Sequence, residues 1–206
     1  MRPMTYRAAD FLWVILAALP MVVAGCGTSK PSQLYLLRSL RESEAGVSTT
    51  ADKLGPTVLV GPVTLPAYLN RAQVVTLAGD REVVLDEVTR WAEPLQENFS
   101  RVLVENLSLL LNTPEVYAFD RRGSTPVDFQ IIIDVTRFDT VAQGDAYLTA
   151  FWRVVGKSSK APIIKRKSVF HAAASSAGIT QILDAQNQTL TEFSRELAAA
   201  IQSLPR

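Results

Sequence analysis

VDFQIIIDVTRFD, residues 127–139, alternates apolar and polar side chains along its length. The apolar positions are Val127, Phe129, Ile131, Ile133 and Val135. Successive side chains of a β-strand point to opposite faces of its sheet, so this period of two predicts a strand with one buried face and one wet face. The sheet that contains this strand must bury its apolar face under a second layer.

Short runs of β-type composition lie on both sides of this strand. Between two of them, the segment AGDRE places Gly79 and Asp80 at the tip of an expected hairpin. We expect strands at 33–37, 57–63, 72–78, 82–88, 115–119, 146–156 and 162–175.

Two longer segments carry apolar residues at the three- and four-residue spacing of an α-helix. The first, 92–112, has Pro94 in its expected first turn. The second runs from Gly178 to about Ser203. These features predict an α+β fold: a two-layer sandwich with a mostly antiparallel or mixed sheet and two long amphipathic helices on one face. We expect a single domain over 33–206, with a mobile loop at about 39–56, where the sequence is polar and aperiodic.

The N-terminus has the layout of a secretory signal peptide. The basic residues Arg2 and Arg7 precede an apolar run of thirteen residues, 11–23. This run is shorter than the roughly 20 residues that a helix needs to cross a bilayer core. It leads into VAGC, residues 23–26, which resembles the lipobox of bacterial lipoproteins and contains the only cysteine of the chain.

This resemblance implies that residues 1–25 are a lipoprotein signal peptide with Val23, Ala24 and Gly25 as the cleavage motif. Cys26 then becomes the acylated first residue of the mature protein. An incidental buried cysteine and a nucleophile are the alternatives. A nucleophile needs a base nearby, however, and the single histidine, His171, is far away in the sequence.

Covalent acyl chains on Cys26, such as palmitate, would tether the domain to a membrane, because two or more chains hold a protein stably. Residues 26–32 form the expected lipidated tether, and its six residues after Cys26 reach at most about 20 Å. Gly27 follows the cysteine instead of the aspartate that resembles an inner-membrane retention signal. We therefore expect a lipid-anchored protein of the outer membrane that faces the periplasm.

The charge balance excludes several classes of partner. The chain has 21 basic and 20 acidic side chains, and removing residues 1–25 leaves 19 of each. A neutral mature domain offers no general attraction for nucleic acid, so we expect no nucleic-acid partner.

No enzyme motif is present in the sequence. It lacks a Gly-x-Ser-x-Gly elbow, a phosphate-binding glycine loop and a cluster of histidines or cysteines at metal-ligand spacing. We therefore expect no catalytic residues, no metal and no cofactor other than the acyl chains on Cys26. His171 is interpreted as a structural or surface residue.

Two features of the later strands concern interactions. Lys165, Arg166 and Lys167 alternate in direction along an expected strand, which indicates an edge or solvated strand protected by charge; a phosphate or lipid head-group site is the alternative. In 146–156 apolar side chains occupy both faces, with Phe151 on one and Trp152 on the other. A strand that is apolar on both faces must be buried on both. Because the helices bury one face, a partner subunit is the simplest candidate for burying the other, and this indicates a homo-oligomer.

Two irregular stretches carry a family resemblance: VGPVTLPAYLNRAQVV, residues 60–75, and RWAEPLQENFSRVLVENL, residues 90–107. Together with VAGC, the early LYLL and the closing EFSRELAAAI, they resemble the PqiC-like (YmbA) ABC-type transport auxiliary lipoprotein family over most of the mature chain. The resemblance implies an accessory lipoprotein of an MCE-type transport system that moves lipids or other hydrophobic molecules across the envelope and maintains membrane integrity. It implies an MCE-domain periplasmic protein as partner and a possible lipid cargo.

The same resemblance supplies the candidate contact residues. They are Leu65, Pro66, Tyr68, Leu69, Arg71, Gln73, Arg90, Trp91, Glu93 and Pro94, to which the two-faced strand adds Phe151. A purely structural role is the alternative for several of them: the prolines would set a turn and a helix start, and Trp91 would be core.

Three functions compete at this point. The first is a non-enzymatic transport accessory that acts by protein contact. The second is a scaffold or pilot lipoprotein for the assembly of an envelope or secretion complex, without lipid handling. The third is a hydrolase, and scattered carboxylates are the only evidence for it.

Overall fold

The computed structural model describes residues 31–45, 55–79, 81–121, 126–141, 144–157 and 161–205. Residues from Ser32 onward belong to one compact unit. The expected signal peptide, its cleavage motif, Cys26 and most of the tether lie outside the described residues, as does the middle of the expected loop, 46–54.

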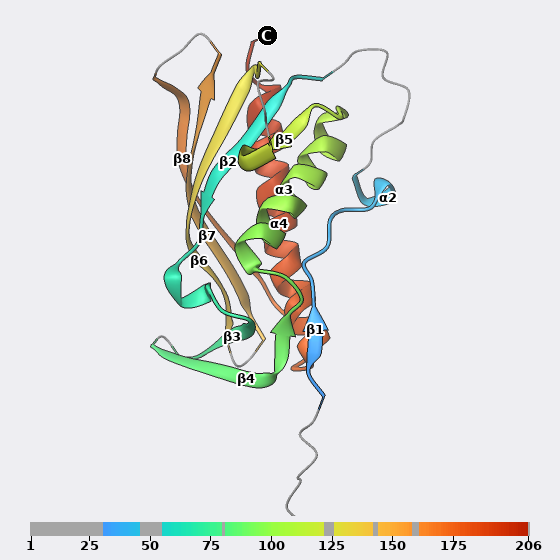
Figure 1. Ribbon diagram of the computed structural model, residues 1–206, viewed down its shortest axis with the longest axis vertical. Helices are drawn as coiled ribbons and strands as arrows, with labels where there is room; N and C mark the ends of the chain where they lie inside the picture. Colours follow the sequence, from blue (N-terminus) through green and yellow to red (C-terminus); the bar gives the residue numbers. More distant parts are fainter. Residues whose placement is uncertain are drawn as a thin grey trace, which may run out of the picture. The chain divides into compact units, whose positions relative to one another are not determined.

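Eight strands form one sheet, and two long helices pack on it (Figure 1). The strands are β1 (Gln33–Tyr35), β2 (Val58–Thr64), β3 (Gln73–Ala78), β4 (Glu82–Trp91), β5 (Val116–Ala118), β6 (Phe129–Val141), β7 (Ala146–Gly156) and β8 (Pro162–Ala172). The helices are α2 (Glu42–Ala45), η1 (Ala67–Leu69), α3 (Leu95–Leu111), η2 (Phe119–Arg121) and α4 (Ile179–Gln202). The predicted α+β class is confirmed, and every expected strand and long helix is present.

The sheet is built around β6. β7 pairs antiparallel with β6 along nearly its whole length, and β8 continues this meander. On the other edge of β6, β2 pairs with the first half and β3 with the last two residues, both in parallel. β1 and β5 add further parallel pairs, and β3 and β4 form the expected hairpin. The sheet is therefore mixed.

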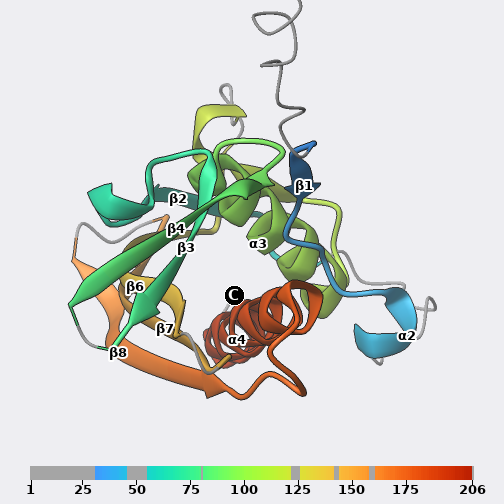
Figure 2. The ribbon, with the colours of Figure 1, turned by 90° about the horizontal axis from the view of Figure 1, so that it is seen from below.

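Both long helices lie on the same face of the sheet, which curves around them (Figure 2). α3 packs on β2 and β5, whereas α4 packs on β6, β7 and β8. The ring of Phe99 on α3 meets the ring of Phe138 on β6 edge to face, with centroids 5.0 Å apart. This core confirms that two helices cover one face of the sheet.

The segment after β1 is fixed to α3. The side chain of Asn98 accepts a hydrogen bond from the backbone N–H of Leu37 at 2.6 Å, and Asn106 accepts one from the N–H of Leu40 at 2.8 Å. Both asparagines are buried, and α2 follows at Glu42. The expected loop at about 39–56 is thus ordered at its start, because buried amides on a distant helix supply the partners of its backbone.

The alternation of β6 does not continue to its end. Phe129, Ile131, Ile133 and Val135 are buried as predicted, but the register shifts between Val135 and Arg137. Such a bulge inserts one extra residue and reverses which positions face the core. Asp139 consequently lies on the face of the sheet opposite the helices, yet it is buried there.

Candidate contact surface

The segment LPAYLNR, residues 65–71, connects two strands that share one edge of β6. β2 leaves this edge where Thr64 pairs with Asp134, and β3 rejoins it where Thr76 pairs with Thr140. The intervening chain forms η1 beside the unpaired stretch of β6 that contains the bulge. The motif is therefore a crossover that bridges a gap in the sheet edge.

Tyr68 fixes this crossover to the sheet. Its hydroxyl donates a 2.6 Å hydrogen bond to the carboxylate of Asp139, which also accepts one from Nε of Arg137 at 2.9 Å. The Arg137 guanidinium lies 3.9 Å from the centre of the Tyr147 ring. A buried carboxylate needs such partners, because leaving it unpaired would be costly. Burial, followed by the hydrogen bond to Asp139, raises the pKa of Tyr68 well above its ordinary value.

The second motif, RWAEP, lies directly beside the first. The backbone N–H of Trp91 donates to the carbonyl of Ala72 at 2.7 Å, and Gln73 pairs with Arg90 across the hairpin. The fold thus brings together two stretches about twenty residues apart, as the contact prediction requires.

Glu93 turns inward from this motif toward α3. Its carboxylate accepts a hydrogen bond from Arg101 at 2.9 Å, and Arg101 also donates to Glu105 at 3.0 Å. The hydrogen bond to Glu93 raises the pKa of Arg101. This ion-paired group holds the start of α3 against the end of β4.

The candidate contact residues divide by burial. Leu69 and Trp91 belong to the core, with Trp91 only 6 % exposed, so the structure supports a packing role for them and leaves little surface for a partner. Arg71 and Phe151 are exposed. The half-buried members are Leu65, Pro66, Tyr68, Gln73, Arg90 and Glu93, and Pro94 precedes the first residue of α3. A contact role for the accessible residues stays a prediction.

The strand that contains Phe151 has two different faces, as predicted. Trp152 points to the helices and donates a hydrogen bond to the Ser168 hydroxyl at 2.8 Å. Phe151 is 45 % exposed on the opposite face and lies between Asp134 and Lys167 in the strand register. The Lys167 ammonium stands 5.5 Å from the centre of its ring. An exposed aromatic side chain beside a cation is a typical interface anchor.

Asp139 and Arg137 were not among the candidates drawn from the sequence. The only feature of the sequence that could have pointed to this pair was an acidic residue at the end of a strongly apolar strand. His171, expected to be a structural or surface residue, is exposed; its Nε2 lies 3.2 Å from Oδ2 of Asp145, and its ring centre lies 4.8 Å from that of Tyr147. Within the described ranges, no group of three metal-ligating side chains is present. Nor does any helix of the described part have the length and hydropathy needed to cross a membrane.

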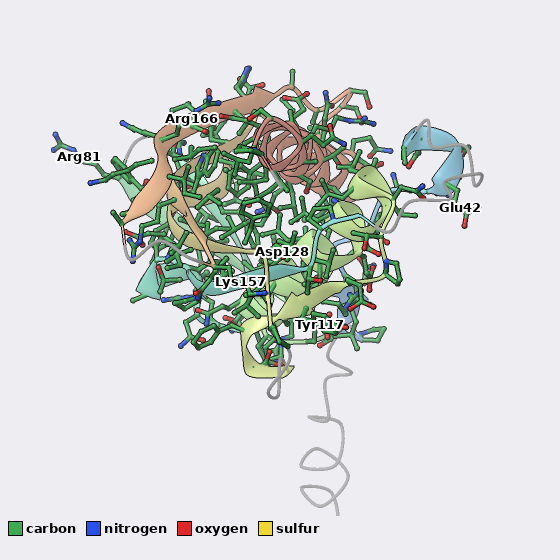
Figure 3. All side chains as sticks on the ribbon, turned by 90° about the horizontal axis from the view of Figure 1, so that it is seen from above. Glu42, Arg81, Tyr117, Asp128, Lys157 and Arg166 are labelled. Atoms are coloured by element: carbon green, nitrogen blue, oxygen red, sulfur yellow. The ribbon has the colours of Figure 1, made fainter. Side chains whose placement is uncertain are left out.

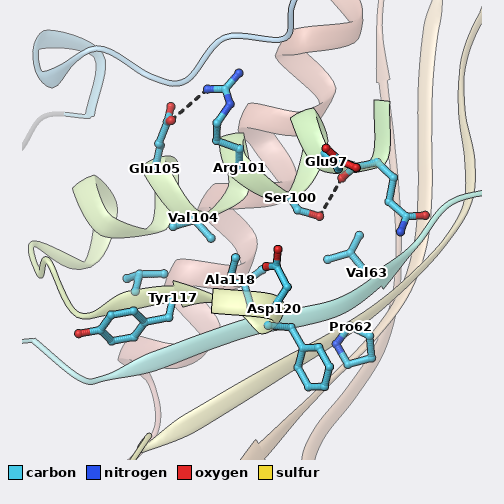
Figure 4. A pocket seen from close by; sticks show the side chains of 14 residues that line it. Pro62, Val63, Glu97, Ser100, Arg101, Val104, Glu105, Tyr117, Ala118 and Asp120 are labelled. Atoms are coloured by element: carbon cyan, nitrogen blue, oxygen red, sulfur yellow. Dashed lines mark hydrogen bonds and ion pairs between the residues drawn. The ribbon is translucent and has the colours of Figure 1, made fainter. Parts of the chain in front are cut away.

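A groove opens on the far side of α3, between that helix and the strand–helix segment β5–η2 (Figure 4). It has a volume of about 580 Å³. Its lining includes the aliphatic side chains of Val63 and Val104 and the carboxylates of Glu97, Glu105 and Asp120. No sequence motif pointed to this groove, because its lining residues come from three separate segments, 60–63, 96–105 and 116–120.

Comparison with known proteins decides the family. The model of the ABC-type transport auxiliary lipoprotein component matches residues 35–198 and so includes both motifs. The chain belongs to this family. The intermembrane transport lipoprotein PqiC of Escherichia coli strain K12 is 24 % identical over 193 residues, which cover 94 % of this chain and 98 % of PqiC. The PqiC protein of Shigella flexneri matches to the same extent.

Solved structures show the same fold for this auxiliary lipoprotein. A crystal structure of an uncharacterised protein superposes with a TM-score of 0.66 at 21 % identity and covers 84 % of this chain and 99 % of that one. A Xanthomonas campestris protein gives a TM-score of 0.65 at 16 % identity, with 81 % and 93 % coverage. Family and relatives together identify an auxiliary lipoprotein of an intermembrane transport system.

Proposed function

We propose that this protein is the outer-membrane-anchored accessory component of an MCE-type transport system that moves lipids or other hydrophobic molecules across the envelope. Acyl chains on Cys26 hold it in the outer membrane, and the folded domain faces the periplasm. It has no catalytic activity of its own and acts by contact with an MCE-domain periplasmic protein.

One observation carries this proposal: the two family motifs meet in space. The pairing of Gln73 with Arg90 places the end of the LPAYLNR crossover, where β3 begins, beside RWAEP at the end of β4. The tyrosine and tryptophan of these motifs hold the backbone in place from inside, and Arg71 remains exposed beside them. A rigid support under an exposed arginine suits a contact surface, because ordered anchor residues lose little entropy on binding.

The test is affinity capture of the native lipoprotein from detergent-solubilised envelopes, followed by identification of the bound proteins and lipids. We expect an MCE-domain protein in the wild-type capture and its loss from the Arg71→Ala capture. Arg81→Ala, an exposed arginine at the tip of the β3–β4 hairpin, is the matched control and should retain the partner. Capture of envelope-assembly proteins without any transport component would support the scaffold or pilot function instead.

A further inference from the structure

The β3–β4 hairpin lies at the end of the sheet where the folded domain begins. β3 pairs with Thr140 and Val141, the last two residues of β6. β1 is parallel to β4 and so runs away from the hairpin tip, with Gln33 beside Thr89. The chain therefore enters the domain from the side of the tip, and Figures 1 and 2 show β1 and the hairpin at one end.

The tip of this hairpin is exposed on both faces. Val83 and Val84 are successive residues of β4, so their side chains point to opposite faces of the strand pair. They are nevertheless 40 % and 44 % exposed. The exposed side chain of Arg81, at the tip, extends away from the rest of the domain in Figure 3. The hairpin thus projects from the domain, and the described residues fully cover neither face of its tip.

The start of the domain adds two more exposed aliphatic side chains to this end. Leu34 in β1 is 64 % exposed, and Leu36, directly after that strand, is 53 % exposed. Four of the eight large apolar side chains that are exposed in the described ranges therefore lie on this hairpin, in β1 or directly after it. Exposed apolar side chains gathered in one region indicate a surface that is covered in the functional state.

The length of chain before β1 indicates what covers this end. Six residues, 27–32, separate Cys26 from β1, and they reach at most about 20 Å when extended. Acyl chains on Cys26 would hold the start of β1 within that distance of the membrane. The hairpin lies at the same end of the domain, so a lipid surface is the nearest apolar environment for its valines.

The charges of this end favour an apolar contact over an electrostatic one. Arg81 is followed by Glu82 at the tip, and both are exposed. Arg90, near the end of β4, forms an ion pair with Glu87 at 3.4 Å. Because each arginine has a carboxylate beside it, this end offers little net attraction for anionic head groups. Burial of aliphatic side chains is then the main source of binding free energy.

We infer that the tip of the β3–β4 hairpin inserts Val83 and Val84 into the head-group region of the membrane to which the protein is anchored, with Leu34 in contact with the same surface. The inference rests on the proposed acyl anchor and adds a second, non-covalent contact to it. A single flexible tether leaves the domain free to rotate, whereas two points of contact fix its orientation. The opposite end of the sheet, at Lys157, is then directed away from the membrane.

A fluorescent dye on the hairpin tip tests this inference in the acylated full-length lipoprotein, reconstituted in vesicles of phosphatidylethanolamine and phosphatidylglycerol. Cys26 is the only cysteine of the chain, so Arg81→Cys introduces the only free thiol of the acylated protein. We expect lipids with doxyl quenchers in their acyl chains to quench the dye on Arg81→Cys. The same dye on Lys157→Cys, an exposed position just after β7, should not be quenched.

A matched pair of substitutions in the Arg81→Cys protein shows whether the valines make the contact. Val84→Asp should remove most of the quenching, because burial of a carboxylate in lipid is costly. Ile163→Asp places the same charge on a β8 side chain of similar exposure, 47 %, and should leave the quenching unchanged. Raising the salt concentration from about 0.1 M to about 1 M should also leave it unchanged, because salt screens only contacts between charges. Thermal unfolding confirms that both variants are folded.

Three results would overturn the inference: quenching at Arg81→Cys no stronger than at Lys157→Cys, full quenching in folded Val84→Asp, or loss of quenching at high salt. A dye whose emission indicates an apolar environment that lipid quenchers do not reach would also overturn it, and would assign the hairpin to a protein contact. Uptake of dye by wild type, whose only thiol is Cys26, would instead contradict the acyl anchor. The experiment thus distinguishes failure of the anchor from failure of the hairpin contact.

Discussion

The hydroxyl of Tyr68 lies 2.6 Å from the carboxylate of Asp139, a residue 71 positions away whose side chain is 1 % exposed. This hydrogen bond attaches the crossover between β2 and β3 to the stretch of β6 with which neither of these strands pairs. It gives Tyr68 a structural role in the crossover that does not require its hydroxyl to reach a partner.

Tyr68→Phe should destabilise the domain. It removes one of the two hydrogen bonds to the buried Asp139 carboxylate, and leaving a buried acceptor underpaired costs about 1–3 kcal/mol. Urea denaturation followed by tryptophan fluorescence measures this loss. Tyr117→Phe removes the hydroxyl of a half-buried tyrosine that donates to Glu115, and it is the matched control. Equal stability of Tyr68→Phe and wild type would show that the bond is dispensable.

The stability of the domain should fall at alkaline pH through Tyr68. Its pKa is raised in the folded state above its ordinary value near 10, chiefly by burial. The unfolded chain then loses this proton at a lower pH than the native protein, so unfolding becomes easier as the pH rises above about 10. Denaturation at pH 8 to 11 should show a decline that is smaller in Tyr68→Phe. An identical decline in both proteins would assign it to other groups.

Trp91→Ala and Phe151→Ala should separate core from surface. Loss of the buried Trp91 ring should cost about 3–5 kcal/mol of stability because it leaves a cavity. Phe151→Ala should change stability by less than about 0.5 kcal/mol, since that side chain lies on the surface and is nearly half exposed. If Phe151 is an interface anchor, its loss should instead weaken association or partner capture by about thirtyfold. Unfolding temperatures and capture yields from the same preparations distinguish the two effects.

Arg71→Ala should weaken partner capture with an unchanged unfolding temperature, because Arg71 is exposed and its neighbours Tyr68 and Leu69 hold the crossover. Quantitative capture on immobilised lipoprotein measures the loss, which for an anchor residue is about 2 kcal/mol or more. Normal capture by Arg71→Ala and Phe151→Ala together would move the contact surface elsewhere.

Cys26→Ser should abolish acylation and leave either an unprocessed precursor or a form released from the membrane, because the hydroxyl replaces the modified thiol. Mass spectrometry of the mature N-terminus checks this directly. An unmodified Cys26 in correctly exported wild-type protein would refute the lipid anchor.

Much of the local structure followed from sequence periodicity. The second long helix, expected from Gly178 to about Ser203, is present as Ile179–Gln202. The period of two in 127–139 correctly predicted the buried face of β6 as far as Val135. Periodicity succeeds here because it reflects which side of each element is apolar, a property of neighbouring residues alone. The family motifs could also be recognised from the sequence, because they are irregular combinations of residues.

The tertiary structure alone decided what those motifs do. Trp91 has the same chemistry as a core residue or as an interface anchor, and only the tertiary structure, in which it pairs with Tyr35 of β1, bonds to Ala72 and joins the hydrophobic core, places it inside. The bulge after Val135 carries no sequence signal, yet it turns Asp139 into the buried partner of Tyr68. Burial and edge position depend on residues far apart in the chain, so they become defined only when the long-range strand pairs have formed.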